Sequence, residues 1–254
     1  MDYTLKKSLG QHFLVDESVS ERIVQYLMQH PPARLLEVGP GGAALTKHLL
    51  ELKDVDLLCV ELDAEKVGWL EKNFPALKGK IIHQSVLDIA PPFEGRFTVV
   101  GNFPYNISSQ IVFRIIEWKN QVECMIGMFQ KEVAERIAAH EGSKTYGVTS
   151  VLVQAFFDVE YLFEVGQEAF NPPPKVKSAV IRFLPRKASI EMHSQKALFT
   201  VVKAAFNQRR KTLRNALKPL FSEEILKEEL FNKRAEQLSV EEFAALTFRL
   251  KSSQ

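Results

Sequence analysis

Short apolar runs alternate with helix-like patterns over the first half of the chain. Apolar residues recur every three or four positions in 19–27, 45–52, 67–74 and 111–118, which predicts helices, the first of them capped by Asp16. The runs typical of buried strands lie between these helices, at 34–38, 56–61, 80–83, 97–100 and 123–128. Apolar strands separated by helices predict an α/β fold with a parallel sheet covered on both faces.

The pattern changes near residue 156. Two strand-like runs, 158–165 and 176–183, are separated by a proline-rich loop, which predicts an antiparallel hairpin at the sheet edge. The polar stretch 186–194 has the composition of a linker, and the remaining apolar residues have helical spacing. We therefore predict an α/β domain over residues 1–185 and a small all-helical domain over residues 194–254.

Composition narrows the class of protein. The 254 residues are 46% hydrophobic and 25% charged, which is typical of globular proteins and excludes collagen-like or wholly disordered chains. Cys59 and Cys124 lie in apolar runs, which favours buried free thiols in a reducing compartment. Without a membrane-length apolar run or a secretion signal, we expect a soluble, cytoplasmic protein.

A glycine-rich turn follows the first predicted strand, over residues 37–42. Glycines allow a ligand to approach the backbone closely, and Glu61, 22 positions after Gly39, ends the second strand where a carboxylate can bind the hydroxyls of an adenosine ribose. A dinucleotide, S-adenosylmethionine or a tight turn without a ligand are all compatible with this arrangement. The missing G-x-G-x-x-G pattern argues against the dinucleotide.

A second motif, Asn102-Phe103-Pro104-Tyr105, ends the fourth predicted strand, at the sheet edge where open α/β sheets bind ligands. The amino group of adenine is a poor nucleophile because its lone pair is delocalised into the ring. We predict that the Asn102 side-chain oxygen and the Phe103 carbonyl accept hydrogen bonds from the two N–H groups of this amine. Pro104 restricts the backbone of Phe103. Tyr105 offers a ring on which a base can stack. An Asn-Pro turn with a core tyrosine is the structural alternative.

Positive charge is concentrated in one C-terminal segment, although the chain carries a net charge of only +2. Residues 203–218 contain no Asp or Glu, and their basic residues are Lys203, Arg209, Arg210, Lys211, Arg214 and Lys218. Such a segment can neutralise phosphates of a nucleic acid, or it can form a solvated helix face. The histidines have no recognised metal-ligand spacing, so no metal is expected.

Together these motifs resemble the bacterial small-subunit (16S) ribosomal RNA adenine N6,N6-dimethyltransferase family. The segments that carry the resemblance follow one another in the family's order at 7–14, 37–42, 61–63, 102–106, 170–176 and 206–213. The resemblance implies a Rossmann-like S-adenosylmethionine-dependent methyltransferase fold with a helical RNA-binding domain. It also implies that the substrate is the small-subunit ribosomal RNA of an immature small ribosomal subunit, on which a monomer dimethylates two adjacent adenines near the 3′ end.

The resemblance also implies roles for individual residues. His12 and Leu14 would border the methyl donor, Glu61 would bind its ribose, and Gly39 would contact its amino-acid part. Asn102 would lie between the donor and the target base. Phe170 would stack on the flipped adenine, although taken alone it is equally well explained as a core aromatic.

Two positions depart from the family pattern. Ala43 stands where a third glycine is usual, and Ser85 stands where an aspartate commonly accepts a hydrogen bond from the donor's adenine. Ser85 still offers an acceptor, but one without charge, so donor affinity is expected to fall. Asp88 is displaced along the strand end and is not assumed to replace it.

Two other functions remain open at this point. An adenine-N6 methyltransferase acting on DNA or on another RNA would use the motif at Asn102 equally well. A non-catalytic RNA-binding assembly factor could keep the fold and lose efficient chemistry, and the change at Ser85 makes this worth testing. The segments 10–14 and 206–213 favour the ribosomal RNA enzyme.

Overall fold

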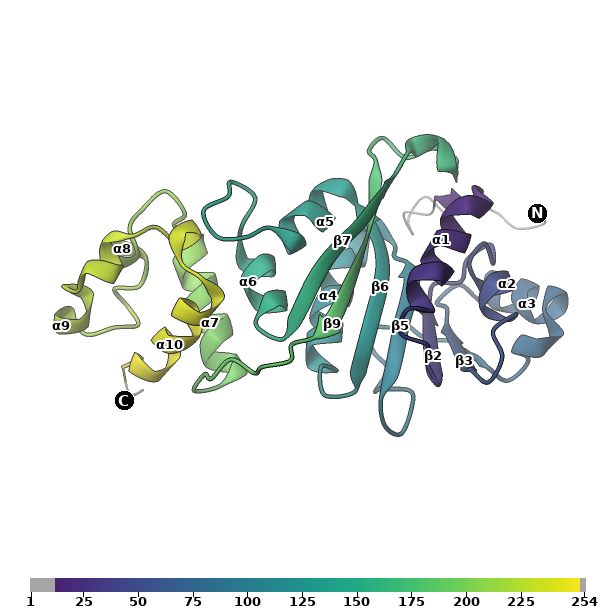
Figure 1. Ribbon diagram of the computed structural model, residues 1–254, viewed down its shortest axis with the longest axis horizontal. Coiled ribbons are helices and arrows are strands. Elements are labelled where there is room, and N and C mark those ends of the chain that lie inside the picture. Colours follow the sequence, from purple (N-terminus) through teal and green to yellow (C-terminus); the bar gives the residue numbers. More distant parts are fainter. Residues whose placement is uncertain (1–11, 252–254) are drawn as a thin grey trace. The chain divides into compact units, whose positions relative to one another are not determined.

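The computed structural model describes residues 12–251, and its centre is a mixed seven-stranded sheet (Figure 1). The strand order is β4-β3-β2-β5-β6-β9-β7. The strands of this sheet are β2 (Arg34–Val38), β3 (Asp56–Val60), β4 (Ile81–Ile82), β5 (Phe97–Asn102), β6 (Val122–Gln130), β7 (Phe157–Val165) and β9 (Ser178–Pro185). The five strands from β4 to β6 pair in parallel, and β9 is antiparallel to β6.

The strand positions agree with the pattern of the sequence to within two residues at most boundaries. The run 34–38 forms β2 over the same residues, and the second half of the predicted hairpin adds β9 beside β6, with β7 as the outer strand. A further two-stranded sheet pairs β1 (Phe13–Leu14) with β8 (Phe170–Asn171), with Leu14 opposite Phe170. This small sheet joins two segments that are far apart in the sequence.

Helices cover both faces of the large sheet. In Figure 1, α1 (Glu17–Leu27) lies in front of the sheet and α4 (Ser108–Glu117) lies behind it. Asp16 caps α1 by accepting a hydrogen bond from the Ser18 amide, as the sequence predicted. The front face also carries α2 (Thr46–Leu49) and α3 (Ala64–Asn73), because residues of all three helices share one buried cluster with the strands. The predicted parallel, doubly covered sheet is therefore confirmed.

The described residues fall into two compact units, 12–134 with 160–185, and 135–159 with 186–251. The helices from α5 onward are α5 (Lys131–Ala138), α6 (Val148–Gln154), α7 (Gln195–Asn207), α8 (Leu213–Ala216), α9 (Glu223–Leu226) and α10 (Val240–Leu246). Short 3-10 turns connect elements at η2 (Pro75–Leu77), η3 (Tyr105–Ile107), η4 (Gln167–Ala169), η5 (Glu229–Asn232), η6 (Ala235–Gln237) and η7 (Thr247–Arg249). These units differ from the predicted domains in grouping residues 135–159 with the helices after residue 185.

The two cysteines are buried, as their apolar neighbours in the sequence predicted. Both are free, and burial raises the pKa of the Cys124 thiol to about 12. None of the helices within residues 12–251 has both the length and the apolar character needed to cross a membrane.

Candidate functional site

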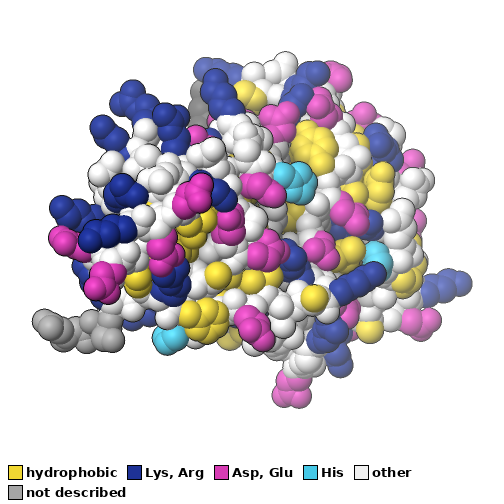
Figure 2. Space-filling view, turned by 60° about the vertical axis from the view of Figure 1, so that its left-hand side comes forward, with side chains coloured by type: hydrophobic (Ala, Val, Ile, Leu, Met, Phe, Trp, Pro, Cys, Tyr) yellow, Lys and Arg dark blue, Asp and Glu magenta, His cyan; other side chains and the backbone are white. Residues whose placement is uncertain are grey.

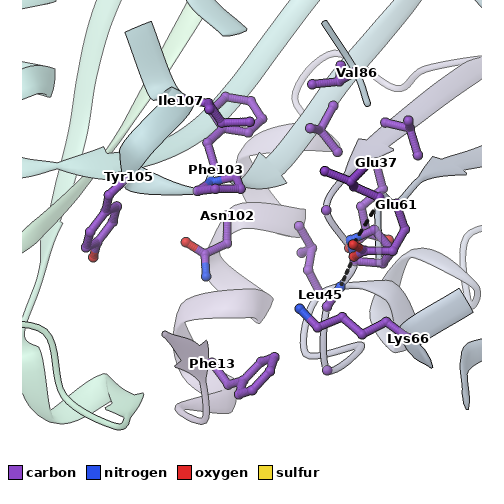
Figure 3. Close-up of a pocket in the computed structure, with 18 of the residues that line it drawn as sticks. Phe13, Glu37, Leu45, Glu61, Lys66, Val86, Asn102, Phe103, Tyr105 and Ile107 are labelled. Carbon is purple, nitrogen blue, oxygen red and sulfur yellow. Dashed lines mark hydrogen bonds between the residues drawn. The ribbon is translucent and has the colours of Figure 1, made fainter. Parts of the chain in front are cut away.

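A pocket opens in the first unit at the carboxyl ends of β2, β3 and β5 (Figure 3). Its lining includes the turn 38–42 after β2, residues 60–62 after β3 and residues 102–107 after β5. Parallel strands end at the same edge of a sheet, so the loops that follow them converge there. The two motifs singled out in the sequence therefore line one cavity.

The turn after β2 is built around backbone conformations that favour glycine. Gly39 and Gly41 have φ angles of 70° and 54°, in the left-handed region. The Gly41 amide donates to Glu61 Oε2 at 3.3 Å, and the amides of Leu62 and Asp63 donate to Glu61 Oε1, each at 2.9 Å. Three N–H donors hold the carboxylate beside the turn, as the dashed lines at Glu61 in Figure 3 illustrate in part.

A second carboxyl group lies deeper in the same wall. Glu37 in β2 is 2% exposed, and burial raises its pKa to about 7 although the nearby Thr46 hydroxyl and Cys59 thiol partly offset this effect. The Cys59 thiol donates to Glu37 Oε2 at 3.6 Å. The pocket therefore contains one carboxylate that accepts hydrogen bonds from three amides and one carboxyl group that gains its proton near neutral pH.

Asn102, the last residue of β5, points into the cavity. Its side-chain Nδ2 donates to the His12 carbonyl at 3.4 Å, which occupies the nitrogen end of the amide. In Figure 3 the oxygen end lies on the side of Tyr105. The amide oxygen is thus directed to the pocket, where it can accept a hydrogen bond from a ligand.

Phe103 fixes the loop that follows Asn102. Its ring is 1% exposed and packs edge-on against Phe129 with centroids 5.1 Å apart. Gly101 and Gly127 make room for it, because a Cβ at these positions would lie 2.9 Å and 2.3 Å from the Phe103 ring. The backbone at Asn102 is therefore held by close packing rather than by a flexible loop.

Tyr105, in η3, is held by two distant segments. Its hydroxyl lies 2.6 Å from Ser178 Oγ at the start of β9, and its ring centroid lies 5.5 Å from that of His12. Burial raises the pKa of the Tyr105 hydroxyl, so the ring stays neutral at ordinary pH. The tyrosine thus presents an uncharged, fixed ring at the pocket wall.

The pocket brings together most residues selected from the sequence. Those that line it are His12, Leu14, Gly39, Glu61, Ser85, Asn102, Pro104 and Tyr105. Phe170 is different: it is 3% exposed, belongs to the buried core cluster and is not among the lining residues. Its placement agrees with the core-aromatic alternative, and a role in base stacking stays a prediction.

Ser85 and Ala43, the two positions that depart from the family pattern, both lie near the pocket in sequence or in space. Ser85 lines the pocket and its hydroxyl accepts from the Leu87 amide at 3.2 Å, whereas Asp88 is exposed and does not line the cavity. Ala43 has a φ of 63°, so an alanine occupies the left-handed conformation that its usual glycine adopts more easily. The backbone at Ala43 is therefore strained, which it would not be with a glycine there.

Several lining residues were not selected from the sequence. Phe13 sits between two selected residues, and Leu62, which is 55% exposed, follows Glu61 directly. Lys66 lies in the first turn of α3, with its ammonium 5.0 Å from the Phe13 ring centroid. Leu62 belongs to the segment 61–63 that carries the family resemblance, whereas proximity in sequence to Glu61 is the only signal for Lys66.

The basic segment lies in the second unit and its members have different surroundings. Lys203, Arg210 and Lys211 are exposed. Arg209 donates to the Lys144 carbonyl and lies 3.8 Å from Glu236 Oε2, and Arg214 donates to the Leu226 carbonyl at 2.8 Å. Figure 2 shows Lys and Arg side chains gathered at the upper left of the face it presents. Arg209 and Arg214 therefore hold the fold of this unit in addition to adding positive charge.

Within residues 12–251, no three His, Cys, Asp or Glu side chains are grouped as a metal site would require.

Comparison with protein families identifies the group to which the chain is related. The family model described as ribosomal RNA adenine dimethylase matches residues 3–251. The chain belongs to the ribosomal RNA adenine dimethylase family. It is 53% identical over 247 residues to the ribosomal RNA small subunit methyltransferase A of Parabacteroides distasonis, covering 95% of this chain and 92% of the relative. The protein of the same name from Flavobacterium johnsoniae is 51% identical over 251 residues, covering 97% and 96%.

Solved structures confirm the methyltransferase fold. A dimethyladenosine transferase from Plasmodium falciparum matches with a TM-score of 0.77 at 23% identity, covering 91% of this chain and 94% of that one. The 23S rRNA methyltransferase ErmE matches with a TM-score of 0.69 at 24% identity, covering 92% and 99%. At these identities the likeness concerns the fold alone.

Proposed function

We propose that this protein transfers methyl groups from S-adenosylmethionine to the N6 amino groups of two adjacent adenines near the 3′ end of small-subunit ribosomal RNA. The observation that carries the proposal is the orientation of Asn102, whose amide oxygen is directed into a pocket shared with Tyr105 and Glu61. Membership of the adenine dimethylase family supports the reaction. The names of the bacterial relatives support the small-subunit RNA as substrate.

The pocket residues fit S-adenosylmethionine. Its ribose hydroxyls are donors and match the Glu61 carboxylate, whose oxygens are already oriented by three amides. The glycines of the turn keep side chains away from the space that the amino-acid part needs. Leu62, Val86 and Ile107 provide apolar surface for an adenine ring, with the Ser85 hydroxyl beside it. When bound, the cofactor supplies a methyl group on a positively charged sulfur.

Asn102 has the central part in the reaction. A target adenine that leaves its stack, at a cost of a few kcal/mol, can place its amino group near the Asn102 oxygen. A hydrogen bond to this oxygen, and a second to the Phe103 carbonyl, would draw the amine toward a tetrahedral geometry and free its lone pair for attack. The protein thus contributes alignment and hydrogen-bond acceptors.

Tyr105 orients the base. Its ring is fixed by Ser178 and stays neutral, so it offers a rigid surface for stacking, typically worth ~1–3 kcal/mol per base. Because the ring cannot move away, the adenine is held in one plane while its amino group is methylated. For the second methyl transfer, the adenine ring must lie in the same plane while its amino group already carries one methyl group.

The substrate particle and the state of the enzyme belong to the same proposal. We place the monomeric enzyme in the cytoplasm, acting on ribosomal RNA within an immature small subunit. The exposed basic residues of the second unit, Lys203, Arg210 and Lys211, supply charge for phosphate contacts.

Methyl transfer from labelled S-adenosylmethionine to immature small subunits tests the function. We expect dimethyladenine near the 3′ end of the small-subunit RNA with the wild-type protein. Asn102→Ala should lower turnover by at least about 10²-fold while RNA affinity stays nearly unchanged, because it removes an acceptor needed at the reacting nitrogen.

The outcomes separate the alternatives. Labelling of duplex DNA in preference to ribosomal particles would make this a DNA adenine methyltransferase. Tight binding of the particle without methyl transfer would make it an assembly factor. Wild-type turnover by Asn102→Ala would remove this residue from the mechanism.

A further inference from the structure

Arg114, in α4, reaches the loop that carries Ser85. Its Nε donates to the Val86 carbonyl at 3.4 Å, and its Nη2 donates to the Leu87 carbonyl. At the other end of the guanidinium group, Nη1 donates to Glu117 Oε2 at 2.6 Å. The planar group is therefore anchored on its own helix, and it holds two consecutive carbonyls of the loop.

Ser85 holds the same two peptide units by their N–H groups. The Leu87 amide donates to Ser85 Oγ at 3.2 Å, and the Asp88 amide donates to the Ser85 carbonyl at 3.0 Å. In a trans peptide the C=O and N–H groups point in opposite directions, so each unit lies between Arg114 and an oxygen of Ser85. The position of Ser85 Oγ is therefore coupled to Arg114 through the peptide bond that precedes Leu87.

The Ser85 hydroxyl has room for one more hydrogen-bond donor. Its oxygen has two lone pairs, and the Leu87 amide occupies one of them. Ser85 lines the pocket together with Val86 and Ile107, which lie along the upper side of the cavity in Figure 3. The amino group of an adenine ring that rests on this apolar surface is a donor that the second lone pair can accept.

We propose that Arg114 is a positioning residue for S-adenosylmethionine, which keeps Ser85 Oγ where it accepts a hydrogen bond from the amino group of the cofactor's adenine. This inference rests on the proposed function, which puts the adenine ring beside Ser85. Arg114 is not among the residues that line the pocket, so its effect passes through the loop.

Arg114→Met tests this role, because methionine keeps an unbranched stem beside Trp118 but donates no hydrogen bond. The ligands are S-adenosylhomocysteine and its analogue without the 6-amino group on the purine, and titration calorimetry measures both Kd values. We expect the wild-type protein to bind S-adenosylhomocysteine about 5-fold more tightly than the analogue, the usual effect of one hydrogen bond. In Arg114→Met this ratio should fall to about 1, through loss of affinity for S-adenosylhomocysteine alone.

Two further variants serve as controls. Ser85→Ala should lower the ratio to the same value, and adding Arg114→Met to it should change the ratio no further, because both act on one hydrogen bond. Arg186 also donates to a backbone carbonyl and to a glutamate, but it belongs to the second unit and does not line the pocket. Arg186→Met should therefore keep the wild-type ratio and affinities.

The Kd ratio distinguishes positioning from general support of the fold. Equal losses of affinity for both ligands in Arg114→Met would overturn the proposal, as would a wild-type ratio in this variant or equal binding of both ligands by wild type. Arg114→Lys serves if the methionine variant does not fold. An ammonium group lacks the planar fork that holds both carbonyls, so the ratio should be intermediate, and an undiminished ratio would overturn the proposal.

Amide hydrogen exchange in the free protein gives a test without any ligand. The Leu87 amide should exchange faster in Arg114→Met than in wild type, because its peptide is no longer held at the carbonyl. An unchanged rate would overturn the proposal. If wild-type protein binds S-adenosylhomocysteine but methylates no RNA, only the proposed reaction fails, whereas a wild type that does not bind it would overturn both.

Discussion

At the scale of single residues, the pocket contains two carboxyl groups with opposite surroundings. Glu61 accepts hydrogen bonds from three backbone N–H groups. Glu37 is buried, and its partners are the Thr46 hydroxyl and the Cys59 thiol. A buried carboxyl group keeps its proton to higher pH because its charged form loses hydration. The stability of the fold is therefore expected to depend on pH through Glu37.

The first prediction concerns this pH dependence. The folded pKa of Glu37 is raised from 4.5 to about 7, so the unfolded chain loses this proton first as the pH rises. The stability contributed by the protonated form is complete below pH 4.5 and is lost between pH 4.5 and about 7, by on the order of 3 kcal/mol. Glu37→Gln should remove this loss, as measured by urea unfolding at pH 5 and pH 8.

Glu17 provides a comparison of opposite sign. Hydrogen bonds from Lys47 and His48 lower the pKa of this carboxylate, so its contribution is present above the unfolded pKa and is lost as the pH falls. Glu17→Gln should leave the decline between pH 5 and pH 8 intact. A decline that also persists in Glu37→Gln would show that another group causes it.

At the scale of elements, the position of the loop that carries Asn102 depends on packing between neighbouring strands. β5 and β6 place Gly101 opposite Gly127, and the ring of Phe103 lies against both. The absence of two side chains thus creates the space that anchors the residue after Asn102. This anchoring is tertiary, because β5 and β6 are separated in sequence by α4.

The second prediction follows from this packing. A Cβ at residue 127 would lie 2.3 Å from the Phe103 ring and 2.8 Å from the Phe129 ring, so both rings must move. Gly127→Ala should destabilise the fold by ~1–3 kcal/mol and lower methyl transfer, since the displaced Phe103 shifts Asn102. Urea unfolding and turnover measure the two effects.

Gly68 provides the matched control. It lies within α3 and a Cβ there would meet no atom within 4 Å. Gly68→Ala should therefore stabilise the protein by ~0.5–1 kcal/mol and leave turnover unchanged. Equal stability of wild type and Gly127→Ala would mean that the rings adapt without cost.

At the scale of the whole molecule, positive and negative charges nearly balance, so any strongly positive surface must come from a local concentration of Lys and Arg. With a net charge of only +2, binding to RNA depends on local groups of Lys and Arg. Arg209 and Arg214 are bonded to backbone carbonyls, so their removal would affect folding as well as binding. Arg210 and Lys211 are exposed and allow a cleaner test.

The third prediction concerns the salt dependence of RNA binding. Arg210→Ala with Lys211→Ala should weaken binding and lower the slope of log K against log salt by about 1–2, because up to two phosphate contacts are lost. Fluorescence anisotropy across a salt series measures this slope. The exposed pair Lys53→Ala with Lys78→Ala, which precedes the amino ends of β3 and β4, should leave it unchanged. Equal slopes in wild type and the Arg210–Lys211 variant would exclude both residues from phosphate contact.

The sequence by itself determined the strands, the parallel sheet and the two motifs of the pocket. Apolar periodicity reflects which face of an element is buried, so runs such as 34–38 are recognisable locally. Glu61 and Asn102 were found because a polar residue directly after a buried strand lies at the carboxyl edge of a parallel sheet. These inferences need only neighbouring residues and the topology that they imply.

Only the tertiary structure decided contacts between residues that are distant in sequence. No local signal in the sequence predicts the hydrogen bonds between Tyr105 and Ser178 and between His12 and Pro172. The same holds for the burial of Phe170 and for the hydrogen bond from Arg209 to the Lys144 carbonyl. Residues 135–159 likewise joined the second unit although β6 precedes them and most of β7 follows them. Such contacts depend on how separate elements pack around a shared core, and periodicity along the chain does not encode that arrangement.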